Sequence, residues 1–177
     1  MQPHAAALAR ELSHRILRSH SATAALLAWC EEHQLASGPV TVVRRLHGSA
    51  GAADSRILSK LNPEPGEPIS YREVSLIRDR VVLAEAQNWF RPQRLKPSML
   101  EALESTDLPF GTVIAPLRPR RQTFFVAYYD ALTCGQRPKE SSWYLDPIGD
   151  DPAILFEHRA VVSDEEHNRP LAVVREL

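Results

Sequence analysis

The sequence predicts an α+β fold, in which an antiparallel β-sheet of about five to six strands carries helices packed on one side. Segments with helical periodicity come first, strand-like segments follow, and after one more helix the chain returns to strands. The strand-like segments are hairpin neighbours without a regular strand–helix–strand alternation, so a parallel sheet is not expected. A length of 177 residues suits one domain with a sizeable core, and we expect a single domain over residues 1–177.

The N-terminal part of the chain is expected to hold two helices and one strand. Residues 4–18 place leucine and isoleucine along one helical stripe. A second helix is expected to begin at Ser21, because serine is a favourable N-cap residue, and to run through Cys30. Val40–Leu46 contains valine and threonine in a pattern that favours a strand.

The middle of the chain predicts an irregular connection followed by a hairpin. Residues 47–68 contain Gly, Ser, Asn and Pro, which indicates a long connection with a short helix around Ser55–Leu61. Tyr71–Arg78 and Val81–Phe90 are the two clearest strands. The pair Asp79-Arg80 between them predicts a tight turn, although it lacks the usual glycine.

The second half of the chain predicts one helix and three more strands. Pro97 suits the first turn of a helix, and Thr106–Leu117 is expected to be a turn followed by a short apolar stretch. Gln122–Tyr129 predicts a strand rich in aromatic residues, and residues 133–152 have the proline and glycine content of a loop insertion. The last strands and the polar turn that joins them are expected at Ile154–Val162, Asp164–Arg169 and Leu171–Leu177.

Composition argues against several classes of partner. The formal net charge is -1, so no general attraction to nucleic acid or to an anionic membrane is expected. The basic residues Arg118, Arg120 and Arg121 are more typical of a solvated loop than of a nucleic-acid site. No apolar run approaches the roughly 18 residues of a spanning helix, and the N-terminus lacks the pattern of a signal peptide. We therefore expect a cytoplasmic monomer or homodimer. Cys30 and Cys134 lack metal-binding spacing, and no metal or cofactor is expected.

Strand alternation places four polar side chains on otherwise apolar faces. Side chains of a strand point alternately to its two faces, so each of these residues shares a face with apolar neighbours. A buried charge is costly unless it is paired or meets a ligand, and an arginine fork suits a carboxylate. The four residues are Arg72, Asn88, His158 and Glu176.

A purely structural explanation exists for each of these residues. Arg72 and Glu176 could form a salt bridge with each other, or lie at strand ends where water reaches them. His158 is more often a satisfied core histidine than a catalyst. Asn88 more often fixes a backbone edge than contacts a ligand. Alternation alone therefore does not establish a binding site.

Four short segments resemble the chorismate pyruvate-lyase family, which shares its fold with the effector-binding domains of some transcriptional regulators. They resemble, in order, a Ser-x-Thr segment, an Arg-Glu-Ile strand, a Thr-Pro-Leu-Gly turn and a closing strand with a single glutamate. Their order and spacing together carry the resemblance, which covers most of the chain from about Ser21 to Glu176. The segments are Ser21-Ala22-Thr23, Tyr71-Arg72-Glu73-Val74, Leu108-Pro109-Phe110-Gly111, and Arg169-Pro170-Leu171 followed by Glu176.

The resemblance implies roles for particular residues. The ligand carboxylate would be held by Arg72 and by the backbone N–H groups of Ala22 and Phe110. Glu176 would lie at the opposite end of the ring and act as a proton donor or shuttle near the departing ether oxygen. Arg72 and Glu176 are thus the expected catalytic residues, with Asn88 and His158 as further contacts in a reaction that needs no cofactor.

The sequence also departs from the family pattern. Asn88 takes roughly the place of a second arginine, so one positive charge is missing, and Arg91 or Arg94 could replace it. Residues 133–152 are longer than the family's loop. These differences suggest a divergent branch whose substrate has changed.

Two functions follow from the resemblance. The first is elimination of pyruvate from chorismate to give 4-hydroxybenzoate, or a reaction on a related small aromatic carboxylate. The alternative is a non-catalytic protein that binds a small benzoate-like carboxylate. No winged-helix segment is recognisable in the sequence, so a DNA-binding regulator is not expected. A structural or interaction protein would leave Arg72 and Glu176 unexplained.

Overall fold

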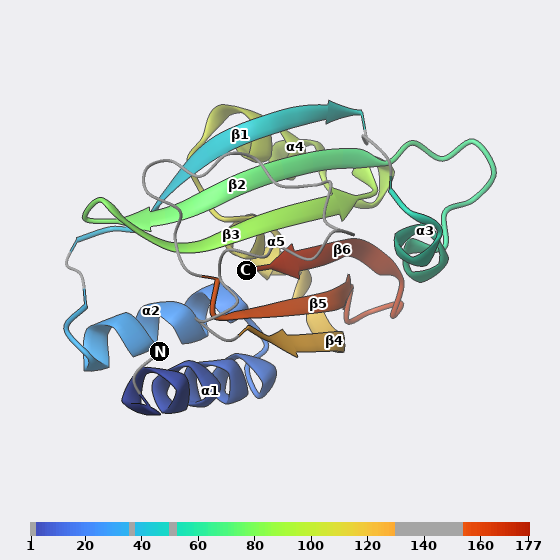
Figure 1. Cartoon of the computed structure of the whole chain (residues 1–177). Helices are drawn as coiled ribbons and strands as arrows, with labels where there is room; N and C mark the ends of the chain where they lie inside the picture. The colour runs from blue at the N-terminus through green and yellow to red at the C-terminus, as the bar shows by residue number, and fades with distance from the viewer. Residues whose placement is uncertain (1–2, 36–37, 50–52, 130–153) are drawn as a thin grey trace.

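One six-stranded sheet organises the described part of the chain (Figure 1). The structure is a computed structural model, and it describes all residues except 1–2, 36–37, 50–52 and 130–153. The expected loop at 133–152 and Cys134 lie outside the described residues. The elements in chain order are α1 (Pro3–Leu17), α2 (Ala22–Glu32), β1 (Thr41–Ser49), α3 (Ser55–Leu61), β2 (Ser70–Arg78), β3 (Val81–Phe90), the 3₁₀ helix η1 (Pro92–Arg94), α4 (Pro97–Ser105), α5 (Phe110–Ile114), the 3₁₀ helix η2 (Ala115–Leu117), β4 (Arg120–Tyr128), β5 (Phe156–Ser163) and β6 (Pro170–Glu176).

The strands pair antiparallel throughout, in the order β1-β2-β3-β6-β5-β4. The expected α+β fold is therefore confirmed. The last strand, β6, enters the middle of the sheet between β3 and β5 (Figure 1). There Glu176 lies beside Ala86 of β3 and His158 of β5. Central pairing of β6 thus brings a glutamate from the end of the chain to the interior of the sheet.

The β2–β3 hairpin is confirmed, together with its two-residue turn. Asp79 and Arg80 have φ angles of 48° and 65°. Positive φ at both central residues matches the right-handed twist of the flanking strands, and aspartate tolerates this region better than most residues. The resulting register pairs Arg72 with Asn88.

Helices cover both faces of the sheet, with most of them on one face. The α1 and α2 pair packs on Val74 and Leu76 of β2, and the α4 and α5 pair packs on β5 and β6. The short α3 packs on the opposite face, where Trp89 and Val173 meet it. The face under α1, α2 and α5 is the one to which alternation assigned Arg72, Asn88, His158 and Glu176. In the described part of the chain no helix is long and apolar enough to cross a membrane.

Two local predictions were wrong. Residues 47–49 belong to β1 instead of an irregular connection, because they pair with Ser70, Tyr71 and Arg72 of β2. Pairing with a neighbouring strand overrides the weak strand propensity of glycine and serine. Thr106–Leu117 contains α5 and η2 instead of a simple turn and apolar stretch. A five-residue helix is too short for its periodicity to appear in a sequence.

Candidate ligand-binding site

A cavity of about 250 Å³ lies between the sheet and the helices α1, α2 and α5. Its walls are mainly apolar, with Leu12 and Ile16 from α1, Leu26 from α2 and Val74 from β2. This volume is near the lower end of the roughly 300–1,000 Å³ of sites for drug-sized ligands, so a small ligand fits best. Ala22, Asn88, Phe110, His158 and Glu176, all expected site residues, line this one cavity.

One corner of the cavity is polar, because the starts of α2 and α5 meet there. Ser21 caps α2, its side chain accepting a hydrogen bond from Ala24 N at 3.2 Å. A Cβ atom on Gly111 of α5 would lie 3.8 Å from Ser21 Oγ and 3.9 Å from Thr23 Oγ1, so the two helix starts are in close contact. First-turn N–H groups have no partner inside their helix and attract anions. We call Ser21, Ala22, Thr23 and Gly111 the polar corner.

Asn88 adds a hydrogen-bond donor to the cavity wall. Its side chain is 3% exposed, and Nδ2 is buried without a hydrogen-bond partner among the described residues. A buried amide that lacks a partner is rare and usually indicates water, an ion or a ligand. Asn88, which stands where the resembled family has a second arginine, therefore still presents a hydrogen-bond donor to the cavity.

Arg72 is fully buried, but it is not one of the residues that line the cavity. Its Nη2 donates to the carbonyl oxygen of Leu108 at 3.2 Å, in the segment that leads into α5. In this structure Arg72 therefore fixes the start of α5. Direct contact of Arg72 with a ligand stays a prediction.

The arginine that lines the cavity is Arg121 of β4. Its Nη2 donates to Glu176 Oε2 at 2.5 Å, and its Nη1 donates to Thr123 Oγ1 at 2.5 Å. The Arg121 side chain is 5% exposed and that of Glu176 is 24% exposed. Nε of Arg121 is buried and has no hydrogen-bond partner within the described ranges. Glu176 thus forms an ion pair with Arg121.

The expectation that Arg121 belongs to a solvated loop was wrong. Arg118 and Arg120 are exposed and pair with Glu165, as a surface cluster does. The strand β4 begins at Arg120, two residues earlier than expected, and pairs Arg121 with Val162 of β5. Residues directly opposite in a sheet share a face, so Arg121 points to the cavity side like Val162. The alternation of β4 would have shown this if the start of the strand had been known.

His158 joins the cavity to α1. Its Nε2 lies 2.8 Å from Ser13 Oγ, and Ser13 Oγ lies 2.9 Å from the hydroxyl of Tyr128. Nδ1 is buried and has no hydrogen-bond partner in the described part of the chain. Burial, together with the nearby positive charge of Arg121, lowers the pKa of His158 to about 4. The ring is therefore neutral at pH 7, and it offers Nδ1 as an uncharged hydrogen-bonding group.

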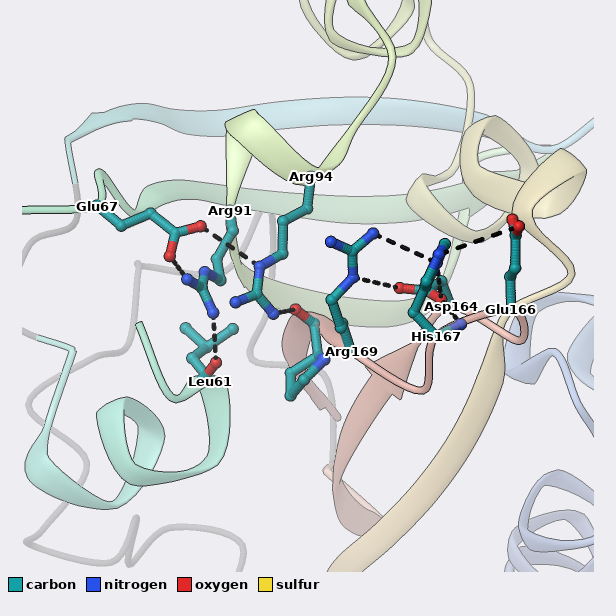
Figure 2. A network of polar contacts seen from close by, with 9 residues as sticks. Leu61, Glu67, Arg91, Arg94, Asp164, Glu166, His167 and Arg169 are labelled. Carbon is teal, nitrogen blue, oxygen red and sulfur yellow. Dashed lines mark hydrogen bonds and ion pairs between the residues drawn. The ribbon is translucent and has the colours of Figure 1, made fainter. Parts of the chain in front are cut away.

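Arg91 and Arg94, the suggested substitutes for the missing arginine, do not line the cavity. Both belong to a network of polar contacts around Glu67 (Figure 2). Arg91 is fully buried, forms an ion pair with Glu67, and donates to the carbonyl oxygens of Leu61 and Asn62 at 3.1 and 2.7 Å. Arg94 donates to Pro170 O at 2.7 Å. Both side chains hold loops together and take no part in the cavity. Within the described residues no group of three or more His, Cys, Asp and Glu is placed to hold a metal ion.

No protein-family profile matches the chain. A curated relative, "Uncharacterized protein y4mC" from Sinorhizobium fredii, is 34% identical over 177 residues, covering 96% of this chain and 73% of that protein. The chain belongs to the y4mC family. Membership of the y4mC family indicates no activity by itself.

Solved structures share the fold of this y4mC family member. The effector domain of PhnF from Mycobacterium smegmatis is 19% identical with a TM-score of 0.56, over 89% of this chain and 87% of that domain. The longer PhnF chain is 18% identical with a TM-score of 0.58, over 90% of this chain and 64% of PhnF. The ligand-binding domain of a protein assigned to the GntR family of transcriptional regulators from Bordetella bronchiseptica is 12% identical, with a TM-score of 0.50 over 79% of this chain and 82% of that domain.

These likenesses show the fold alone. The chain has the UTRA-like fold of the ligand-binding, or effector, domains of GntR-family regulators. The expected relation to regulator effector domains is confirmed at this level. The lyase family itself is not shown by these comparisons.

Proposed function

We propose that this chain is a small-molecule-binding domain whose cavity holds a benzoate-sized carboxylate without converting it. One observation carries the proposal. Three residues on the wall of a mainly apolar cavity each have a buried polar atom without a partner among the described residues: Asn88 Nδ2, Arg121 Nε and His158 Nδ1. Each such atom costs about 1–3 kcal/mol, which a ligand with matching polar groups would recover.

The polar corner would receive the carboxylate. The first-turn N–H groups of α2, at Ala22 and Thr23, supply donors and the positive end of the helix dipole. Asn88 Nδ2 supplies a side-chain donor, and the backbone N–H of Phe110 is a further candidate donor. A carboxylate accepts several such bonds at once, because each oxygen has two lone pairs.

The apolar walls would hold the ring of the ligand. Val74, Ala86 and Val174 of the sheet lie on the side opposite to the helical residues Leu12 and Leu26. Burial of apolar ring surface contributes roughly 25 cal/mol per Å² of area removed from water. A planar ligand between a sheet and helices would therefore gain affinity from both sides.

Gly111→Ala tests the polar corner. The added Cβ atom would lie at ordinary contact distance from Ser21 Oγ and Thr23 Oγ1, so the fold tolerates it, but it would occupy the space of the carboxylate. We expect benzoate affinity, measured by isothermal titration calorimetry at pH 7, to fall at least tenfold. Circular dichroism should remain unchanged, and alanine suits a helix better than glycine.

Ser98→Ala, on the exposed surface of α4, is the matched control and should bind like the wild type. Equal benzoate affinity of Gly111→Ala and wild type would show that the carboxylate does not occupy this corner. Absence of binding of benzoate and its ring-substituted derivatives to the folded wild-type protein would contradict the proposed function.

Elimination of pyruvate from chorismate is the second candidate, and the position of Glu176 favours it. Glu176 reaches the cavity wall, where it forms an ion pair with Arg121. Under this function Arg72 would anchor the ring carboxylate. Glu176 would take the proton that the ring loses on aromatisation and pass it to the enolpyruvyl group, which leaves as the ether C–O bond breaks and becomes pyruvate. Pyruvate and 4-hydroxybenzoate would be measured after addition of chorismate. Glu176→Gln should abolish this turnover and largely spare benzoate binding, whereas turnover by that variant at the wild-type rate would contradict the role of Glu176.

A further inference from the structure

The ion pair of Arg121 with Glu176 lies at one end of the cavity, and the ligand carboxylate is proposed to bind at the other end, in the polar corner. Asn88 of β3 pairs with Val174 of β6. Glu176 lies two residues beyond Val174 along β6, where it pairs with Ala86. Two residues of a strand span roughly 7 Å, which is the scale of one six-membered ring with its substituents. A ring whose carboxylate lies beside Asn88 would therefore extend its opposite substituent toward Glu176. The inference rests on the proposed function.

The charges at this end cancel. Arg121 and Glu176 are joined by a 2.5 Å contact and carry opposite unit charges. His158, in the same row of the sheet as Glu176, is neutral at pH 7 because its pKa is lowered to about 4. Glu85 also contributes to the cavity wall, but it pairs with Ser75 and its side chain lies on the face of β3 opposite to Ala84 and Ala86. A second anionic group of a ligand would thus compete with Glu176 for Arg121, and it would meet no other positively charged side chain among the described residues at this end of the cavity.

The same end offers hydrogen bonds to an uncharged group. His158 Nδ1 is unpartnered among the described residues and either donates or accepts, depending on the tautomer. Nε of Arg121 is a second buried atom without a partner among the described residues at this end of the cavity, and it can only donate. A hydroxyl group donates one hydrogen bond and accepts others, so it can satisfy both kinds of partner without breaking the ion pair.

We propose that the Arg121–Glu176 pair selects ligands with a single carboxylate and an uncharged polar group at the opposite end of the ring, and excludes ligands with a second charge there. The pair acts as a specificity determinant, because either partner alone would attract a substituent of opposite charge. A site built on charge cancellation discriminates by leaving the wrong ligand's charge unpaired in an apolar cavity.

The proposal is tested with three ring compounds that differ only in the substituent opposite the carboxylate. These are 4-hydroxybenzoate, whose substituent is neutral, terephthalate, which carries a second carboxylate, and 4-(aminomethyl)benzoate, which carries an ammonium group. Calorimetry at pH 7 should show that the wild type binds 4-hydroxybenzoate at least tenfold tighter than either charged compound.

Two single variants should change the preference in opposite directions. Glu176→Gln releases Arg121, so the affinity for terephthalate relative to 4-hydroxybenzoate should rise at least tenfold. Arg121→Gln releases Glu176, so the relative affinity for 4-(aminomethyl)benzoate should rise by a similar factor. The double variant Arg121→Gln/Glu176→Gln removes both charges of the pair together, so neither is left unpaired, and it should regain the wild-type order of preference. It also keeps the test informative if a single variant is poorly folded.

The outcomes separate this inference from the proposed function. Wild-type protein that binds terephthalate as tightly as 4-hydroxybenzoate would overturn the inference and leave a carboxylate site standing. Variants that weaken all three compounds in parallel would assign the pair a structural role only, which also overturns the inference. Failure of all three compounds to bind the folded wild type would overturn the proposed function itself.

Discussion

The buried polar side chains at the cavity show how individual residues prepare a site. Arg121 and His158 each make hydrogen bonds to other side chains, and Asn88, Arg121 and His158 each keep one buried atom without a partner among the described residues. A protein core normally satisfies such atoms, because an unmade buried bond costs about 1–3 kcal/mol. Their common location on one cavity wall therefore indicates an interior arranged for an additional molecule.

Two arginines of the same strand illustrate how position decides the energetic role of a charge. Arg120 is 66% exposed and its ion pair with Glu165 is expected to contribute little, because water screens both groups. Arg121, one residue on, is 5% exposed and has exchanged water for Glu176 and Thr123. Loss of one partner of such a pair leaves an uncompensated charge in an apolar interior. Arg121 is therefore expected to control both ligand preference and local stability.

At the scale of elements, Arg91 joins three segments that packing alone would leave apart. Its guanidinium binds the carbonyl oxygens at the C-terminal end of α3 and pairs with Glu67 in the following loop, while its backbone N–H donates to Leu171 O of β6 at 3.0 Å (Figure 2). Both side chains of the ion pair are buried, at 0% and 7% exposed. The interaction fixes α3 against the face of the sheet that carries Trp89.

Replacement of Arg91 by methionine should destabilise the protein strongly. The substitution keeps the apolar stem but leaves the nearly buried Glu67 with Arg94, 3.4 Å away, as its remaining cation. It also leaves two carbonyl oxygens without their donor, so a loss of about 3 kcal/mol is expected. Urea denaturation monitored by circular dichroism would measure it. Arg118→Met, whose side chain is 83% exposed, is the matched control and should change stability by less than about 1 kcal/mol. Similar losses for the two variants would show that the Arg91 network is dispensable.

Elements with local sequence signals were predictable, among them the seven-residue helix α3 at Ser55–Leu61, whereas α5 was not. The β2–β3 hairpin and the N-cap of α2 follow from residues that act locally, at Asp79, Arg80 and Ser21. The helix α5 depends on tertiary contacts, such as the bond from Arg72 to the segment before it, which no local pattern reveals. Five residues of helix are marginal without such support.

Strand alternation located part of the candidate site, because it too is a local pattern in the sequence. It placed Asn88, His158 and Glu176 on one apolar face, and all three line the cavity. It did not find Arg121, because the expected strand began at residue 122 and the arginine was assigned to a loop. It also gave no indication of the contact between Ser13 and His158, since these residues lie 145 positions apart in the sequence. Partners that meet only through the tertiary fold leave no local signal.

At the scale of the whole molecule, the two faces of the sheet have different contents. One face holds the cavity between apolar walls. The opposite face carries a buried ionic group in which Arg175 donates to Glu157 Oε1 and Oε2 at 2.8 and 2.9 Å. Burial alone would raise the pKa of Glu157, but the hydrogen bonds and charge of Arg175, together with hydrogen bonds from Tyr129 and Arg159, outweigh burial and hold that pKa below its usual range. Stability of this face therefore requires an ionised carboxylate, while the cavity face requires a neutral histidine.

Both requirements make the folded protein sensitive to acid. The pKa of His158 is about 4 in the folded protein and 6.5 when unperturbed, so between these values the unfolded chain binds a proton that the folded chain does not. Stability therefore falls as the pH falls through this window. Glu157 has a lowered pKa, so its contribution is present above the ordinary carboxylate pKa and is lost in more acidic solution, as the pH falls through the folded value. The two effects have the same sign, and that of His158 appears first.

Unfolding free energies measured between pH 7 and pH 4 should fall by roughly 3 kcal/mol through His158, at about 1.4 kcal/mol for each pKa unit. His158→Gln removes the titrating ring, so the variant should lose much less stability than the wild type over this range. His14→Gln, on the exposed surface of α1, is the control and should keep the acid sensitivity of the wild type. Urea denaturation at half-unit pH steps would give all three profiles. Parallel profiles of His158→Gln and wild type would contradict a neutral His158 in the folded protein whose pKa is lowered by burial.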